Sequence, residues 1–325
     1  MAGVWSLSPK SMAREWQERR GLKIDMTTSL LWIPVTLVAA AAQTGRNATQ
    51  RRLTETIGTV GATQVRFLYG FPFALLALAV MNLVTGEVVP GPNATFLTFA
   101  LTGAVTQILA TALMLAAMRE RAFSVVTAYT KTEPVQVALF GLVLLGDHLT
   151  PAMGLAIAVA TSGVLLMSVK PGTSLTSSGV KPILFGLASG AFFALAAIGF
   201  RGAILSLDEG SPLIRASTTL VWGLGLQTTI LLIWLGLFDR KALMASFKAW
   251  RPSLGAGFLG ALASQFWFIG FALTTAANVR TLALVEVLMA QAVSHRFLSQ
   301  ATTRRELAGM LLILAGVGLL LLAQR

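Results

Sequence analysis

The fold is decided by residues 132–167, TEPVQVALFGLVLLGDHLTPAMGLAIAVATSGVLLM, which place Glu133 near the start of a long apolar segment. A second stretch, residues 285–322, reads VEVLMAQAVSHRFLSQATTRRELAGMLLILAGVGLLLL and places Glu286 in the same position. The two glutamates are 153 positions apart. A carboxylate inside a hydrophobic segment is costly and indicates a functional site. Its occurrence in both halves predicts a duplicated membrane protein with a binding site near the midplane.

The composition supports a membrane protein. The chain has 325 residues, of which 55% are hydrophobic and 12% charged, whereas a soluble domain carries about 25% charged residues. The net charge of +12 would suggest nucleic-acid binding in a soluble protein, but here the basic residues lie in short loops between apolar segments. There is no cysteine, and His148 and His295 are the only histidines. Few metal ligands are therefore present, and we expect no metal, no cofactor and no nucleic-acid partner.

Ten apolar segments are long enough to cross a bilayer, since a spanning helix needs about 20 mostly apolar residues. We expect helices, because the segments lack the strict alternation of a membrane β-strand. The predicted spans are 27–44, 64–85, 95–118, 122–145, 151–169, 180–203, 212–238, 253–273, 278–295 and 306–323.

The ten spans divide into two halves at a polar linker. We predict a polar tail at 1–25, a first repeat at 26–170, a linker at 171–179 and a second repeat at 180–325. Because five spans is an odd number, the second half enters the membrane from the opposite side. The predicted fold is therefore an all-α membrane protein of ten transmembrane helices, arranged as two inverted five-helix repeats.

The loop charges predict an orientation. The loops after the odd-numbered spans carry 14 basic residues, against three on the other side and five in the tail. By the positive-inside rule, both termini should lie outside the cytoplasm. The fourteen are Arg46, Arg51, Arg52, Arg119, Arg121, Lys170, Lys181, Arg240, Lys241, Lys248, Arg251, Arg296, Arg304 and Arg305, and the other three are Arg201, Arg280 and Arg325.

Several motifs in the chain resemble the drug/metabolite transporter superfamily, in particular its EamA-type ten-helix members. They are Glu133-Pro134-Val135, the LLGDHLT turn at 144–150, the glycines at 154 and 163, and the Arg66-Phe67 start of the second span. The turn reads Gly-Asp-His where the family usually has Gly-Glu-Arg, and no proline follows Glu286. The resemblance implies a multi-pass transporter in a bacterial-type cytoplasmic (inner) membrane. Its members carry amino acids, sugars, amines, drugs and other metabolites, and the usual member has its termini inside.

The fourth span carries most of the candidate site. Tyr129, Glu133 and Gln136 recur at helical spacing and share one face, while Lys131 points roughly opposite. Glu133 could bind a substrate amine or a proton, and Lys131 a substrate carboxylate. The alternative is a Lys–Glu pair that only joins helices. Pro134 frees the carbonyl of residue 130, which suggests either a hinge or a tolerated kink.

Glu286 has fewer polar neighbours in the sequence, so we expect it to tune a site whose chemistry lies in the fourth span. If the two halves bring Glu286 close to Glu133, both carboxylates cannot ionise cheaply, and one could carry a proton. Alternatively, a basic residue could neutralise one of them, and the candidates are Lys131, Arg66 and Arg280.

Further candidates lie in other spans. Arg66 and Arg215 open equivalent spans of the two halves. Each could anchor its helix at the interface, or could bind a substrate carboxylate. Gln107 and Gln265 are mid-span amides that could line the site.

These features together predict a secondary active transporter that moves a small polar metabolite, an amino acid or an amine, by alternating access. Proton coupling stays open. The chain has no G-x-x-x-x-G-K-[ST] motif, so ATP is not the direct energy source. A passive channel or a scaffold is the alternative, and a membrane-embedded enzyme is disfavoured because nucleophile and metal constellations are missing. The expected partners are the lipid bilayer and a small polar or zwitterionic substrate. Protons are a further candidate partner, and the oligomeric state is open.

Overall fold

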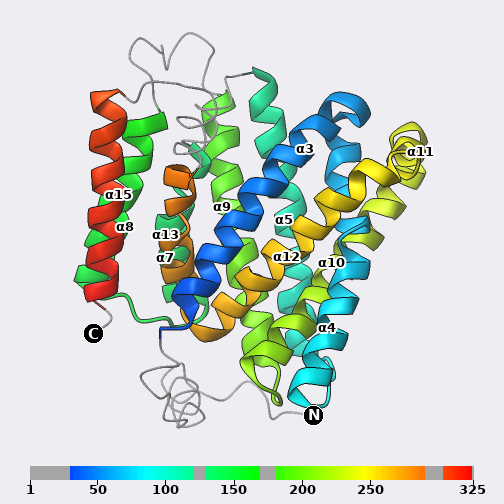
Figure 1. Cartoon of the computed structure of the whole chain (residues 1–325), viewed down its shortest axis with the longest axis horizontal. Coiled ribbons are helices and arrows are strands. Elements are labelled where there is room, and N and C mark those ends of the chain that lie inside the picture. The colour runs from blue at the N-terminus through cyan, green and yellow to red at the C-terminus, as the bar shows by residue number, and fades with distance from the viewer. Residues whose placement is uncertain (1–29, 121–128, 169–180, 290–302, 324–325) are drawn as a thin grey trace, which may run out of the picture. The chain divides into compact units, whose positions relative to one another are not determined.

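The computed structural model describes residues 30–120, 129–168, 181–289 and 303–323. Within these ranges the chain is helical and contains no strand, which confirms the all-α prediction. The helices belong to one unit, Trp32–Arg325 (Figure 1). They are α3 (Trp32–Leu68), α4 (Phe71–Thr85), α5 (Ala94–Glu120), α7 (Glu133–Leu144), α8 (Pro151–Ser168), α9 (Lys181–Ser206), α10 (Pro212–Phe238), α11 (Arg240–Lys248), α12 (Trp250–Leu273), α13 (Ala276–Leu282) and α15 (Arg304–Leu322). The predicted tail and linker lie outside the described residues.

The surface of this unit is apolar, as a bilayer requires. Leu83 and Val143 are about four-fifths exposed (81% and 77%), whereas alanines such as Ala39 and Ala104 are fully buried. Small residues inside and large apolar residues outside are typical of helices that pack closely in lipid. By length and composition, six described helical segments could cross a membrane. They are Val60–Thr85, Ala94–Met114, Leu184–Ser206, Pro212–Phe238, Trp250–Leu273 and Arg304–Leu322.

The predicted count of ten spans is not confirmed, because eleven helices are counted in the described ranges. The predicted loop between residues 44 and 64 is wrong: α3 continues through it as helix and turns at Gly58. Gly58 has φ 74° and ψ 174°, a conformation open almost only to glycine. The loop after the seventh span also contains an unpredicted helix, α11, whose N-cap Asp239 accepts a hydrogen bond from the Ala242 amide at 3.0 Å.

The predicted break between the spans 64–85 and 95–118 and the LLGDHLT turn at 144–150 are both present. Asn93 precedes α5, where its side chain accepts a hydrogen bond from the Phe96 amide at 2.7 Å and donates one to the Ser206 carbonyl at 2.7 Å. Gly146, with φ 63°, lies in the turn between α7 and α8. Both turns sit where proline and glycine interrupt the apolar pattern.

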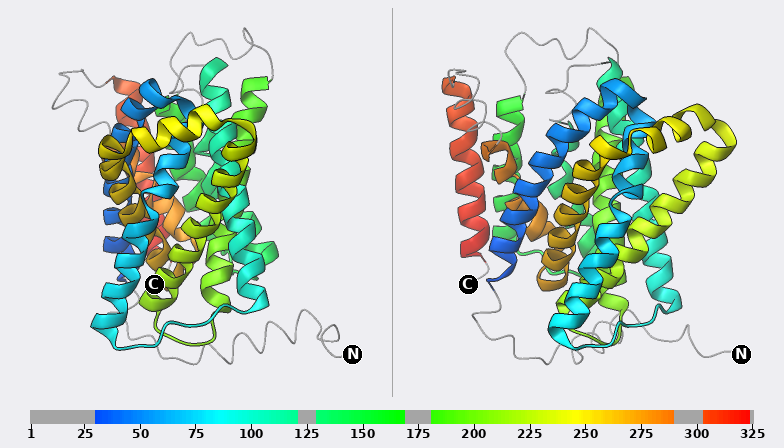
Figure 2. Two further views of the ribbon diagram at one scale, coloured as in Figure 1. Left: turned by 90° about the vertical axis from the view of Figure 1, so that its right-hand side faces the viewer. Right: turned by 45° about the vertical axis from the view of Figure 1, so that its right-hand side comes forward.

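Three helix pairs make the most extensive contacts, namely α3 with α12, α5 with α9, and α8 with α15 (Figures 1 and 2). Glycines allow these close approaches. A Cβ atom added to Gly163 would lie 2.6 Å from the carbonyl oxygen of Gly309, and one added to Gly199 would lie 2.7 Å from the amide nitrogen of Gly103. Each pair joins one helix from the predicted first repeat to one from the second.

Candidate functional site

Two helix breaks lie directly before the two glutamates. Residues 131–132 form a turn before α7, and residues 283–284 form a turn after α13, so the breaks share the 153-residue offset of the glutamates to within one position. Short-range hydrogen bonds mark both turns, with the Val135 amide 3.2 Å from the Thr132 carbonyl and the Glu286 amide 2.9 Å from the Ala283 carbonyl. The prediction of continuous helices over 122–145 and 278–295 is therefore wrong at these points. At the first break the cause is local, because Pro134 has no amide hydrogen to continue a helix.

The two glutamates form ion pairs across the halves of the chain. Glu286 pairs with Lys131, and Glu133 pairs with the Nε atom of Arg280 at 3.2 Å. The Nε2 atom of Gln43 also donates a hydrogen bond to Glu286 at 2.9 Å. Each carboxylate thus has a cation from the other predicted repeat. The side chains of the four charged residues are 11–19% exposed, so solvent still reaches them.

Two aromatic rings contact Arg280, the cation of the Glu133–Arg280 pair. The guanidinium carbon of Arg280 lies 4.9 Å from the ring centre of Trp267 and 5.4 Å from that of Phe271. Such cation–π contacts stabilise a buried charge. The indole nitrogen of Trp267 donates a hydrogen bond to Gln43 at 3.1 Å. Trp267 therefore connects the Arg280–Glu133 pair to the Lys131–Glu286 pair.

The sequence singled out Lys131 and Arg280 as possible partners of the glutamates, but not Gln43. Gln43 was missed, although an amide in a predicted span is the same signal that selected Gln107 and Gln265. Lys131 lies in the turn before α7 and pairs with the second glutamate, Glu286. Glu286 therefore has more polar contacts than its sequence neighbours indicated.

Other predicted site residues lie around this centre or apart from it. Tyr129 packs against α9, where a Cβ on Gly186 would approach the tyrosine Cβ to 2.7 Å. Gln136 donates a hydrogen bond to the Thr132 hydroxyl at 3.3 Å. The two mid-span amides bond to α10 instead, with Gln107 accepting from Gln227 at 2.6 Å and Gln265 donating to Ser217 at 2.7 Å.

Arg66 and Arg215 have different surroundings despite their equivalent positions. Arg66 is only 9% exposed, and its guanidinium carbon lies 5.1 Å from the centre of the Phe67 ring. It does not resemble a side chain that extends to the membrane interface. Arg215 lies within electrostatic reach of Glu87, whose carboxylate also accepts a hydrogen bond from the Ser211 amide at 2.7 Å.

A third ion pair, Asp147–Arg201, also joins the two halves. The Nη1 atom of Arg201 lies 2.7 and 2.9 Å from the two carboxylate oxygens of Asp147, and its Nε donates to the Thr274 carbonyl at 3.1 Å. Both charged side chains are more than 90% buried. Arg201, which we had counted among the loop charges, lies inside α9. Asp147 and Thr274 lie just after α7 and α12, so the contacts of Arg201 join α9 to the ends of these two helices.

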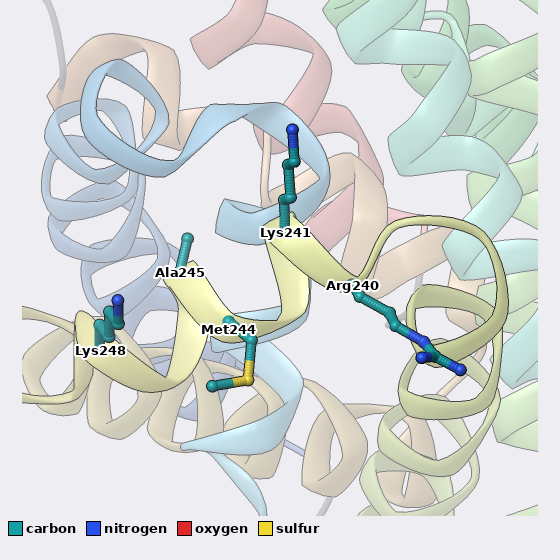
Figure 3. Close-up of a pocket in the computed structure, with 5 residues that line it drawn as sticks. All are labelled: Arg240, Lys241, Met244, Ala245 and Lys248. Carbon is teal, nitrogen blue, oxygen red and sulfur yellow. The ribbon is translucent and has the colours of Figure 1, made fainter.

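A surface pocket lies on α11, formed by Arg240, Lys241, Met244, Ala245 and Lys248 (Figure 3). Arg240 and Lys241 point in different directions, so the pocket does not focus their charges on one point (Figure 3). Met244 and Phe247 of α11 are exposed. A short basic helix with exposed apolar side chains is typical of the membrane interface.

The six described apolar helical segments that could cross a bilayer define the class of protein: a multi-pass membrane protein. The sequence profile of the EamA-like transporter family matches residues 30–169. This match, over residues 30–169, confirms the resemblance to the EamA-like transporter family that the motifs at Glu133 and Gly146 indicated, and it suggests a membrane transporter of that type.

The fold is also found among solved structures. One of them, described as the crystal structure of a protein, aligns with a TM-score of 0.67 at 15% sequence identity. The alignment covers 91% of this chain and 99% of the other chain. This likeness concerns the fold alone. None of the curated proteins matches the chain.

Proposed function

We propose that the protein is a secondary active transporter that moves a small polar metabolite, an amino acid or an amine, across the cytoplasmic membrane by alternating access. The observation that carries this proposal is the crosswise pairing of Glu133 with Arg280 and of Glu286 with Lys131 at two helix breaks. Interrupted helices that expose charged groups near mid-membrane are typical of substrate sites in secondary transporters. Irregular backbone at that depth is tolerated only where protein or a polar cavity surrounds it.

The contacts between helices support two inverted five-helix repeats at 26–170 and 180–325. Under such a two-fold relation, the contact of the first with the eighth predicted span should be repeated by the sixth with the third. The α3–α12 and α9–α5 contacts fulfil this expectation. The fifth and tenth spans should contact each other across the axis, and α8 packs against α15. The family match covers the first of these repeats.

In this proposal the substrate enters between the two ion pairs and exchanges partners with them. A substrate carboxylate would compete with Glu133 or Glu286 for a cation, and a substrate amine would compete with Lys131 or Arg280 for a carboxylate. Because each pair joins the two halves, replacing one partner changes how strongly the halves are held together. Binding can then be coupled to movement of the halves, with Pro134 as a candidate hinge.

The Asp147–Arg201 pair is a candidate gate on one side of this site. It connects the turn after α7 with α9 and, through the Thr274 carbonyl, with the turn after α12. Alternating access requires that such a contact break when the site opens to that side. Proton coupling would require that protonation of a glutamate release its cation. Since both glutamates have a cation, repulsion between the carboxylates gives no separate reason for a bound proton.

Flux into proteoliposomes tests the proposal. The purified protein is reconstituted, and the uptake of labelled amino acids and amines is followed under an imposed solute or proton gradient. We expect saturable uptake of at least one solute, lost in Glu133→Gln because Arg280 is left without its counter-charge. Glu209→Gln is the matched control, since this glutamate is exposed in a loop. Ohmic conductance in a planar bilayer would instead identify a channel.

A further inference from the structure

The charges of the described side chains around the two helix breaks do not balance. Lys131 and Arg280 use the two carboxylates, and each forms one ion pair. Arg66 belongs to the same group, because Arg280 and Arg46 lie close enough to act on it electrostatically. Among the described residues, no carboxylate lies within ion-pair distance of Arg66. The excess of positive charge is present even if Arg46 is left out of the count.

Within the part of the chain whose side chains are described, the surroundings of Arg66 offer it no other anion. The residue is buried, with 9% of its surface exposed, and its guanidinium group lies beside the Phe67 ring. On the α12 side it meets Gly260, where an added Cβ would lie 3.5 Å from the Arg66 Cγ and 3.6 Å from the Arg46 Cδ. Two arginine side chains therefore lie next to a residue that has no side chain. An arginine stays charged at any physiological pH, and a buried charge without a counter-charge is unfavourable.

We propose that Arg66 binds the anionic group of the transported substrate, a carboxylate or a phosphate, so that the substrate class is a small organic anion and not a simple amine. The planar guanidinium group donates parallel hydrogen bonds that match the oxygens of both groups. This inference rests on the proposed function and narrows its substrate.

The existing pairs also disfavour an amine. An ammonium group entering the site would find Glu133 and Glu286 already paired with cations. It would also approach a group with more cations than carboxylates, which repels it. An anion is attracted to the same group. It supplies the missing counter-charge of Arg66 and weakens the repulsion between Arg66 and its basic neighbours.

Ligand-induced stabilisation tests the inference. The full-length protein in lipid nanodiscs of one composition is unfolded thermally with succinate, inorganic phosphate or putrescine. Identical lipids keep the contribution of headgroup phosphate constant, and the succinate and phosphate samples distinguish the two anionic groups. We expect succinate or phosphate to raise the melting temperature, since a ligand that binds the folded state stabilises it, and putrescine to leave it unchanged.

Variants connect the effect to Arg66. Arg66→Gln should abolish the anion-dependent shift, and Arg66→Lys, which keeps the charge but loses the paired donors, should reduce it. Arg304→Gln, at an exposed position, should keep the full shift. The melting temperature of each variant without added ion shows whether the variant folds. If Arg66→Gln does not fold, Arg66→Lys still tests the inference.

Three results would overturn the inference: stabilisation by putrescine alone, no stabilisation by either anion, or an anion effect that Arg66→Gln and Arg66→Lys leave unchanged. Failure of the proposed function is a different outcome, because proteoliposomes would then show no gradient-driven uptake of any solute. Saturable uptake of a cationic amine would contradict only the inference about Arg66.

Discussion

Breaking the Asp147–Arg201 pair, the candidate gate, should shift the protein towards a conformation in which the site is open on the Asp147 side. Asp147→Asn removes the negative charge but keeps a side chain of nearly the same size. Arg201 would then keep its hydrogen bond to the Thr274 carbonyl and one bond to the new amide, and would lose its counter-charge. Because both side chains are more than 90% buried, the cost should reach the range of about 3–5 kcal/mol known for breaking a buried ion pair. We expect about 3 kcal/mol, since part of the hydrogen bonding remains.

Cysteine labelling measures this shift directly, because the chain contains no cysteine of its own. Gln136→Cys places one thiol a turn beyond Glu133 on α7, between the glutamates and the Asp147 turn. A loss of about 3 kcal/mol corresponds to a change of more than a hundredfold in the ratio of the two conformations, at about 1.4 kcal/mol per tenfold. In proteoliposomes, a membrane-impermeant thiol reagent applied from the side of the Asp147–Arg201 gate should therefore react with this cysteine at least tenfold faster in the Asp147→Asn background.

The control is Asp208→Asn, the same change at an exposed loop position. Labelling at an unchanged rate in Asp147→Asn would refute the gate. A double-mutant cycle of Asp147→Asn with Arg201→Gln should give a coupling energy above about 1 kcal/mol in the free energy of unfolding. Strictly additive effects would show that the two side chains do not stabilise the structure through each other.

Three further predictions concern packing, the α3 turn and orientation. Gly163→Ala should lower the free energy of unfolding by about 1–3 kcal/mol in a detergent denaturation series, because its Cβ would lie 2.6 Å from the Gly309 carbonyl oxygen. Gly154→Ala on the same helix meets nothing within 4 Å and should not destabilise the protein. Gly58→Ala should cost about 1–3 kcal/mol in the same assay because φ there is 74°, and Gly61→Ala, which meets only ordinary contacts with Ile57, is its control. A reporter enzyme fused after Arg325 should be active outside the cytoplasm, and activity inside would contradict the orientation expected from the loop charges.

The sequence predicted the features that depend on composition and local pattern. Apolar segments indicated a multi-pass helical protein, and the repeated glutamates indicated where its polar centre lies. The turns at Asn93 and Gly146 followed from proline and glycine signals, which act over a few residues. These features need no knowledge of which helices become neighbours.

The features that were missed depend on contacts between distant segments. Lys131 and Glu286 are 155 positions apart in the sequence, and helical spacing gives no information about which glutamate a lysine will reach. The continuation of α3 past residue 44 was missed because its polar residues resemble a loop by composition. Arg46 lies in that stretch and is buried against α12. A hydropathy pattern would assign such an arginine to the surface.

The most direct test of the account is the initial rate of solute exchange by Glu286→Gln in proteoliposomes, compared with that of Glu133→Gln. The sequence alone gave Glu286 a secondary role, whereas the crosswise ion pairs give the two carboxylates equivalent places in the site. We predict that both variants lose exchange to the same extent while Glu209→Gln keeps the wild-type rate. Exchange at the wild-type rate in Glu286→Gln would contradict a substrate site built from both halves.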